Sequence, residues 1–349
     1  MKMAKDELYM LRCFDLARIG AGKVSPNPMV GAVLVHEDRI IGEGFHQAYS
    51  LAHAEVNAIH RVAPKDRSLI PFSTLYVSLE PCCIYGNTPP CTSLILREKI
   101  PRVVISAFDR TPGVAGQGVQ KLRDEGVQVT TGILMEQGNR LCAIRNTFVT
   151  KPRPYVILKY AQTADGYFAR TNGQQFWISN AFSKRLVHKW RNETDAILIT
   201  GRTAQLDNPR LTNRLFYGKS PQRVILDRRL ELSQDHHIFD QSVPTLIFHS
   251  PTLTPPKPRP GIEYLPLPNN RDLNPVLEQL HQRKISTLMV EGGAGLLQSF
   301  IDQRLWDEAR VFQSKRYLYE GIKAPQLQIK PFMTCEIDDD QLSHFYYNR

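Results

Sequence analysis

The sequence predicts an α/β protein of two domains, and three observations support this class. Apolar, β-branched stretches alternate with segments of helical periodicity, which is typical of layered structures with a mainly parallel sheet. The chain has 349 residues, which favours two domains of roughly 150 to 200 residues over one. Lys151-Pro152-Arg153-Pro154 is a suitable junction, and we place the boundary near it, giving domains of residues 1–148 and 149–349.

The first elements of the chain follow from periodicity and turn residues. Leu8, Leu11 and Leu16 recur at helical spacing within 5–21, and Gly20 and Gly22 end that helix. The residues that follow predict a hairpin of strands 29–35 and 39–44, joined by a polar turn. A helix should follow His53, with that residue as its cap.

The rest of the first half continues the alternation. The apolar run 73–79 predicts a buried strand, and the segment opening at Cys91 predicts a helix start. Further along, the sequence predicts a strand over 102–107, a Gly-punctuated loop over 109–118, a helix over 119–125 and a strand over 127–131.

The second half repeats the same pattern of strand and helix. The expected elements are strands over 155–160, 195–200, 223–227, 245–249 and 287–291 and helices over 181–191 and 273–283. We expect the proline-rich stretch 251–268 to be a surface loop. Gly292–Leu297 follows a strand and can bring backbone amides to a phosphate at a helix N-terminus, although a tight turn explains it equally well. Trp177 could stack on a flat ring or simply pack at the rim of the core.

Bulk composition excludes several classes of protein. No run approaches the ~18 apolar residues of a membrane span, so we expect no membrane partner. The N-terminus lacks the apolar core of a signal peptide, and six cysteines in a chain of this length do not form a disulfide framework. These features predict a cytoplasmic protein.

The net charge of +10 allows more than one kind of partner. Basic proteins attract nucleic acid, membrane surfaces or small phosphorylated molecules. The sequence contains no run of five Lys or Arg residues and no interleaving of aromatic and basic residues. We therefore expect small anionic ligands and no nucleic acid, with a merely solvated basic surface as the alternative.

The most informative pattern is His53-Ala54-Glu55, followed by Pro81-Cys82 and then Cys91. In hydrolytic zinc deaminases one His and two Cys hold Zn²⁺ and leave a fourth position for water, whose pKa the metal lowers towards ~7. Glu55 would carry protons from that water to a ring nitrogen and to departing ammonia. Either half of the pattern alone would suggest only a core histidine or buried cysteines, but the combined order predicts deamination of a nucleobase-like ring.

Two residues near this pattern remain ambiguous in the sequence. Asn27, in the loop before the first strand, and His46, after the hairpin, could line a pocket above the metal. They could equally be a turn residue and a surface side chain.

Several phrases together resemble the family of bifunctional riboflavin-pathway deaminase/reductases. They span nearly the whole chain and comprise SPNPMVGAVLV (25–35), HAEVNAI (53–59), TLYVSLEPCC (74–83) with GNTPPC (86–91), VAGQG (114–118), RPYVILKYAQTADG (153–166) and VEGGAGLL (290–297). Eight residues separate Cys82 from Cys91, whereas cytidine and tRNA-adenosine deaminases usually have two. The resemblance implies a cytidine-deaminase-like three-layer domain followed by a dihydrofolate-reductase-like α/β domain.

The resemblance also implies roles for individual residues. It makes His53, Cys82 and Cys91 ligands of one zinc ion per deaminase domain and Glu55 the catalytic proton carrier. It places at NADPH the residues Ala161, Trp177, Thr203, Asp207, Gly293, Ala294, Gly295, Leu296, Leu297, Gln298 and Ser299. It places at the substrate the residues Gln175, Arg191, Leu211, Arg214 and Glu291. The two arginines suit a 5′-phosphate through charge-assisted hydrogen bonds, although each alone could be a surface ion pair.

The implied function is a two-step conversion of a phosphorylated aminopyrimidine. The first domain would deaminate 2,5-diamino-6-ribosylamino-4(3H)-pyrimidinone 5′-phosphate. The second would reduce the ribosyl side chain with NADPH to give 5-amino-6-ribitylaminouracil 5′-phosphate. The family also implies a homo-oligomer, a dimer or larger. The alternative is a nucleic-acid-editing zinc deaminase with a C-terminal binding module, which the basic charge alone supports.

The chain departs from the family pattern at two loops. Family members commonly have Cys-Ser-His-His-Gly where this chain has Cys82-Cys83-Ile84-Tyr85-Gly86, so Cys83 is a rival ligand for Cys82. Asp109-Arg110-Thr111-Pro112 replaces a more usual Asp-Pro-x-Pro. Neither change removes an expected zinc ligand or Glu55, so we expect activity to be retained.

Overall fold

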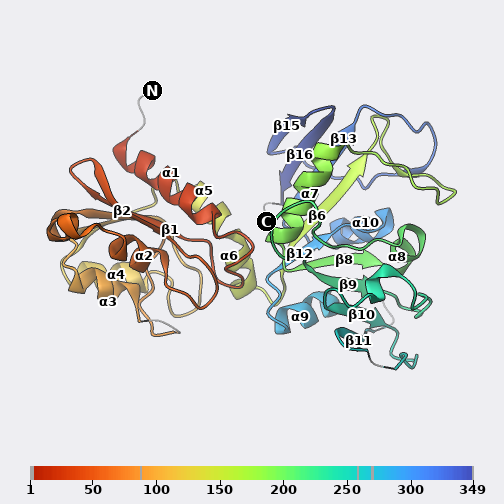
Figure 1. Ribbon diagram of the computed structural model, residues 1–349, viewed down its shortest axis with the longest axis horizontal. Helices are drawn as coiled ribbons and strands as arrows, with labels where there is room; N and C mark the ends of the chain where they lie inside the picture. Colours follow the sequence, from red (N-terminus) through yellow and green to blue (C-terminus); the bar gives the residue numbers. More distant parts are fainter. Residues whose placement is uncertain (1–3, 87–88, 258, 269–270, 348–349) are drawn as a thin grey trace. The chain divides into compact units, whose positions relative to one another are not determined.

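The computed structural model describes residues 4–86, 89–257, 259–268 and 271–347 (Figure 1). The chain divides into two compact units, Met1–Pro152 and Arg153–Arg349. The boundary that we place at residue 148 falls inside helix α6 (Ala143–Thr150), because that helix continues almost to the proline-containing junction. None of the helices in the described ranges combines the length and the apolar character needed to cross a bilayer.

The first unit is built on a five-stranded sheet in the order β2-β1-β3-β4-β5. Strand β1 is antiparallel to both of its neighbours, while β3, β4 and β5 are parallel to one another. The parallel part is therefore confined to three strands, because β1 also pairs antiparallel with β3. The strands are β1 (Gly31–His36), β2 (Arg39–Phe45), β3 (Thr74–Leu79), β4 (Arg102–Ala107) and β5 (Gln128–Thr131).

Helices cover both faces of this sheet (Figure 1). Side chains alternate along each strand, so Val33 and Val35 pack beneath α1 while Ala32 and Leu34 join the opposite core. That opposite core receives the buried faces of α2, α3 and α4. The helical elements of the unit are α1 (Lys5–Arg18), α2 (Ala54–His60), the 3₁₀ segment η1 (Pro64–Phe72), α3 (Cys91–Arg97), α4 (Gln117–Asp124), α5 (Met135–Leu141) and α6.

Two glycines of β2 allow α2 to approach the sheet closely. A Cβ atom on Gly44 would lie 2.3 Å from Ala58 N and 2.5 Å from Ala54 O, and one on Gly42 would lie 2.3 Å from Ala58 O. The backbone of the helix therefore rests directly on the backbone of the strand. This contact sets the position of the first turn of α2.

The second unit contains a nine-stranded sheet in the order β11-β10-β9-β8-β12-β6-β13-β16-β15. The seven strands from β11 to β13 are parallel, and β16 and β15 add an antiparallel edge. The strands are β6 (Tyr155–Gln162), β8 (Ala196–Thr200), β9 (Gln222–Leu226), β10 (Thr245–His249), β11 (Ile262–Pro266), β12 (Thr287–Val290), β13 (Glu308–Ser314), β15 (Met333–Ile337) and β16 (Asp340–Tyr346). A separate pair joins β7 (Tyr167–Ala169) to β14 (Ile322–Lys323).

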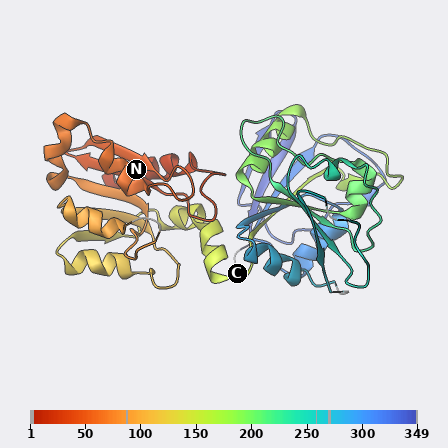
Figure 2. The same cartoon turned by 60° about the horizontal axis from the view of Figure 1, so that its bottom comes forward.

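The helices of this unit also pack on both faces of its sheet (Figure 2). Helices α7 (Ala181–Glu193) and α8 (Gly201–Asp207) pack on one face, and a short 3₁₀ segment η2 (His237–Phe239) adds to the same core. Helices α9 (Asn274–Gln282) and α10 (Ala294–Asp302) pack on the other. The mainly parallel sheet expected from the sequence is found here.

The expectation of a surface loop over 251–268 is wrong at its C-terminal end. Strand β11 lies within this stretch and pairs in parallel with β10. Ile262 and Leu265 are buried, whereas Glu263 and Pro266 are exposed. The prolines of this stretch suggested a loop and so hid the strand from the prediction. Pro266 is tolerated in β11 because β11 is an edge strand.

Candidate functional site

Three separate elements bring the expected metal ligands together in the first unit. His53 has an extended backbone and forms the N-cap of α2, so it lies directly before the first turn of that helix. Cys82 follows β3 through Pro81, and Cys91 is the first residue of α3. One nitrogen and two sulfur atoms of these residues all lie within 4.8 Å of one another.

The distances between these atoms suit a tetrahedral zinc ion. His53 Nδ1 lies 3.6 Å from Cys82 Sγ and 3.3 Å from Cys91 Sγ. With Zn–N near 2.0 Å and Zn–S near 2.3 Å, tetrahedral geometry separates such donors by about 3.6 Å. Cys83, the rival ligand, is not part of this group. The residue types and their spacing therefore fit zinc.

The two ligand cysteines differ in acidity. The pKa of the Cys82 thiol is lowered to about 4, first by a hydrogen bond from Cys91 and then by His53. The pKa of Cys91 is raised by the same hydrogen bond and by burial. A metal ion binds cysteine as the thiolate, so metal binding at this pair would be pH-dependent.

Glu55 lies in the first turn of α2, beside the ligands but outside the ligand group. Its side chain is only 3% exposed, and burial raises the pKa of its carboxyl group. A carboxyl group with a raised pKa can both accept and return a proton near neutral pH. The position and environment of Glu55 therefore suit the role expected of it.

A second buried carboxylate, which the sequence analysis did not single out, fixes the strand end before Cys82. Glu80 accepts hydrogen bonds from the backbone N–H groups of Gly116 (2.9 Å), Gly118 (2.9 Å) and Val119 (3.2 Å). These donors belong to the loop and first turn of α4. Glu80 thereby ties the ligand-bearing end of β3 to the neighbouring helix.

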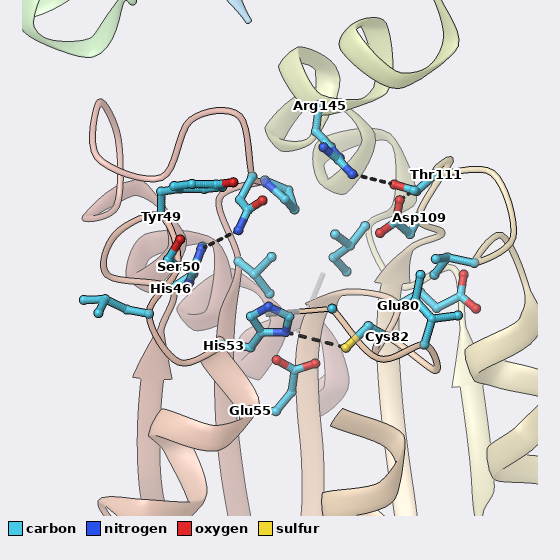
Figure 3. A pocket seen from close by; sticks show the side chains of 18 residues that line it. His46, Tyr49, Ser50, His53, Glu55, Glu80, Cys82, Asp109, Thr111 and Arg145 are labelled. Atoms are coloured by element: carbon cyan, nitrogen blue, oxygen red, sulfur yellow. Dashed lines mark hydrogen bonds between the residues drawn. The ribbon is translucent and has the colours of Figure 1, made fainter. Parts of the chain in front are cut away.

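A pocket with a volume of about 320 Å³ opens above the ligands (Figure 3). Asn27 and His46 line it, which answers the question that the sequence left open. Asn27 Nδ2 lies 3.1 Å from His46 Nε2, and His46 Nδ1 lies 3.1 Å from the carbonyl oxygen of Ala52. The His46 ring also meets the edge of His53, with ring centroids 5.5 Å apart. Ile84 lines the pocket as well, whereas Thr88 of the same loop lies outside the described residues.

In the second unit, several expected cofactor residues gather at the carboxyl ends of parallel strands, where open α/β sheets bind ligands. Ala161 lies near the end of β6, and Thr203 lies in the first turn of α8, directly after β8. Gly293 follows β12 with a φ of 77°, and a Cβ atom there would lie 3.4 Å from Thr203 Oγ1. The turn and the N-terminus of α10 suit a cofactor phosphate.

The remaining expected cofactor residues are more dispersed. Leu296 and Leu297 are buried in the hydrophobic core, so their side chains face away from any ligand. Ser299 Oγ donates to Gly295 O at 2.8 Å, and Gln298 Nε2 donates to Asp302 at 2.7 Å. The turn at 293–299 therefore offers its backbone amides rather than its side chains. Ala294 and Gly295 supply the first of these amides. Asp207 is the last residue of α8 and is exposed. Trp177 is exposed in the loop before α7, and the Lys184 ammonium group lies over its ring.

The expected substrate residues divide into paired and unpaired groups. Arg191 donates to both carboxylate oxygens of Glu291, at 3.1 and 2.8 Å, and to Thr212 O. The side chain of Arg214 has no ion pair with the described residues, and burial and the charge of Arg191 lower its pKa. Leu211 is buried, and Gln175 is exposed in the loop before α7.

Lys159 is a further charged residue at this place that the sequence analysis did not include. Burial lowers the pKa of its ammonium group, and the charge of Glu291 opposes that effect. It lies on β6, two residues before Ala161, inside an otherwise apolar strand. A lysine inside a buried strand was the feature of the sequence from which this residue could have been identified.

Two family models match the chain, one in each unit. Residues 3–107 match the cytidine and deoxycytidylate deaminase zinc-binding region, and residues 154–315 match the RibD C-terminal domain. The zinc-binding match ends in β4 and includes all three expected ligands.

Relatives and solved structures match across nearly the whole chain. The riboflavin biosynthesis protein RibD of Aquifex aeolicus is 36% identical over 329 residues, which is 93% of this chain and 91% of that protein. RibD of Bacillus amyloliquefaciens is 38% identical over 92% of this chain and 87% of that protein. The crystal structure of a diaminohydroxyphosphoribosylaminopyrimidine deaminase/5-amino-6-(5-phosphoribosylamino)uracil reductase from Thermotoga maritima is 37% identical, with a TM-score of 0.88 over 98% of both chains.

Proposed function

Because the chain belongs to the riboflavin biosynthesis protein RibD family and is a bifunctional deaminase and reductase, we propose how each unit carries out its step. The first unit deaminates 2,5-diamino-6-ribosylamino-4(3H)-pyrimidinone 5′-phosphate. The second reduces the ribosyl side chain of the product to ribityl, using NADPH. The observation that carries the proposal is the group formed by His53, Cys82 and Cys91, with buried Glu55 beside it.

In the deaminase step, His53, Cys82 and Cys91 would hold one zinc ion. Zinc, when bound, supplies a water molecule acidic enough to act as a nucleophile near neutral pH. Glu55 would accept a proton from the attacking water, deliver it to a ring nitrogen and assist the departure of ammonia. Asn27 and His46 line the pocket over the ligands and orient the pyrimidine through polar contacts.

In the reductase step, backbone amides from Gly293 onward would hold a phosphate of NADPH, and Thr203 would contribute its hydroxyl group. NADPH supplies the hydride. Arg214 binds the substrate phosphate, because it lacks an acidic partner within the described residues. Arg191 instead holds Glu291 in place through two hydrogen bonds, so Glu291 is oriented towards the sugar rather than free to rotate.

The same reasoning covers partners and compartment. We expect one zinc ion per chain and a homo-oligomer of two or more copies. Thiolate ligands persist in a reducing compartment, which supports a cytoplasmic location. Membership of the family favours this function over the nucleic-acid-editing alternative.

The test is the mass of the product formed from the diaminopyrimidinone phosphate by wild type and Glu55→Gln, with and without NADPH. We expect wild type to give the uracil without NADPH and its ribityl form with it. Glu55→Gln keeps the size of the side chain and should lower deamination by about 10²- to 10⁴-fold, the usual contribution of general acid–base catalysis.

The deaminated intermediate, supplied directly, serves as the internal control. Glu55→Gln should reduce it with NADPH as fast as wild type does, because Glu55 belongs to the other unit. If wild type leaves the diaminopyrimidinone phosphate unchanged but deaminates single-stranded DNA or RNA in a salt-sensitive way, the proposal is wrong and the alternative holds.

A further inference from the structure

Among the described residues, one cation faces the deaminase pocket without an ion-pair partner. Among the eighteen residues that line the pocket, Arg145 is the one lysine or arginine. It comes from α6, a helix that the sequence analysis did not predict. In Figure 3 its guanidinium group lies across the pocket from His53 and Glu55.

The hydrogen bonds of Arg145 leave much of its capacity unused. A guanidinium group has five N–H donors. One terminal nitrogen donates to Pro26 O at 3.4 Å and the other to Thr111 Oγ1 at 3.1 Å. Nε is buried and has no hydrogen-bond partner in the described part of the chain. Both bonds go to neutral acceptors.

The electrostatic surroundings of Arg145 also point to a missing anion. Its charge forms no ion pair within 4.0 Å among the described residues, since Asp109 is the nearby acid and its Oδ1 accepts instead from the backbone N–H of Thr111 at 2.8 Å. Burial lowers the pKa of Arg145, and Asp109 opposes that shift only in part. A half-buried cation in an open pocket is stabilised when an anionic ligand arrives.

The position matches one end of the expected substrate. The ring amine must lie next to the metal ligands and Glu55, so the ribosyl phosphate extends away from them. Arg145, Thr111 and Asp109 lie on the far side of the pocket from the ligands (Figure 3).

We propose that Arg145 binds the 5′-phosphate of the pyrimidine in the deaminase pocket and makes this site selective for phosphorylated substrates. The Pro26 carbonyl and the Thr111 hydroxyl group hold the guanidinium plane, and the remaining N–H groups of the two terminal nitrogens are left for the phosphate oxygens. This inference rests on the proposed deaminase function. It concerns a residue in the first unit, and the arginines assigned to substrate above lie in the second.

The experiment compares kcat/KM for deamination of the phosphorylated substrate and of its dephosphorylated nucleoside, without NADPH. Wild type should prefer the phosphorylated form, and Arg145→Met should lose about 10- to 100-fold on that form and little on the other, as expected for a lost charge-assisted contact. Arg145→Lys keeps the positive charge but not the planar, bidentate donors of the guanidinium group, so its kcat/KM on the phosphorylated substrate should lie between those of wild type and Arg145→Met. Arg97→Met removes one exposed cation from α3 and should match wild type.

The ratio of the two substrates separates binding from structure. If Arg145 only braces the loops at Pro26 and Thr111, both substrates lose equally and the ratio stays at the wild-type value, which overturns the inference. A wild-type ratio near one overturns it as well. If Arg145→Met does not fold, Arg145→Lys becomes the test variant. A wild-type substrate ratio and wild-type inhibition by inorganic phosphate in Arg145→Lys would contradict the assignment. If wild type deaminates neither substrate, the proposed function itself is refuted.

Discussion

Replacing Gly44 with alanine tests whether the backbone contact between β2 and α2 positions the metal site. The added Cβ atom would lie 2.3 Å from Ala58 N and 2.5 Å from Ala54 O, and neither backbone atom can turn aside as a side chain could. To restore van der Waals contact, α2 must withdraw by about 1 Å in a close-packed interior. Overpacking of this kind costs about 1–3 kcal/mol of unfolding free energy.

The same shift moves two functional residues. His53 caps α2 and Glu55 lies in its first turn, so both move relative to Cys82 and Cys91, which other elements hold. A misplacement of 1 Å can cost about 100-fold in rate. Gly44→Ala should therefore bind zinc more weakly and deaminate about 10- to 100-fold more slowly.

The assay combines urea unfolding, zinc content after dialysis against a weak chelator, and deamination without NADPH. Glu43→Gln is the matched control, because Glu43 is the adjacent residue of β2 and pairs with Arg12 of α1 on the other face. That change should cost at most about 1 kcal/mol, the usual contribution of a surface ion pair, and leave zinc content unchanged. If Gly44→Ala keeps wild-type stability, zinc content and rate, the packing argument is wrong.

Two further predictions concern one site each. Cys91→Ser should lose zinc, measured by elemental analysis, and lose deamination while NADPH-dependent reduction of the deaminated intermediate persists; loss of both activities in a folded variant would contradict two independent sites. For Glu291, burial raises the carboxyl pKa, but the charges of Arg191 and Lys159 outweigh burial and lower it to about 2 from 4.5. The ionised Glu291 carboxylate therefore stabilises the fold fully above pH 4.5, and this contribution is lost as the pH falls towards 2. Between these pH values the unfolding temperature of wild type should depend more steeply on pH than that of Glu291→Gln. Equal pH dependence of the two unfolding temperatures would refute the prediction.

The sequence predicted most elements of the fold because their apolar periodicity is strong. Strands β4 and β10 have the bounds that were expected, 102–107 and 245–249. Strand β11 was missed because prolines surround it. Strand β13 was not identified either, since buried Glu308 and its ion-pair partner Arg310 lie inside it and break the apolar pattern.

The metal ligands were recognisable for a different reason. Zinc requires particular side chains, and His53, Cys82 and Cys91 occur in an order that few other structures need. The supporting residues carry no such signal. Glu80 acts through backbone N–H groups 36 to 39 residues away, and Arg145 reaches Pro26 and Thr111, which are 119 and 34 residues away. Only the fold brings such partners together.

The arginines of the second unit show why residue type alone does not assign a phosphate site. Arg191 and Arg214 look equivalent in the sequence, yet Arg191 is bound to both oxygens of Glu291 while Arg214 has no acidic partner within the described residues. A phosphate that recruited Arg191 would leave the Glu291 carboxylate buried without its cation, which typically costs about 3–5 kcal/mol. A phosphate that binds Arg214 costs no ion pair and also relieves its repulsion from Arg191. The energetic balance therefore supports our proposal that the phosphate binds Arg214 and that Arg191 positions Glu291.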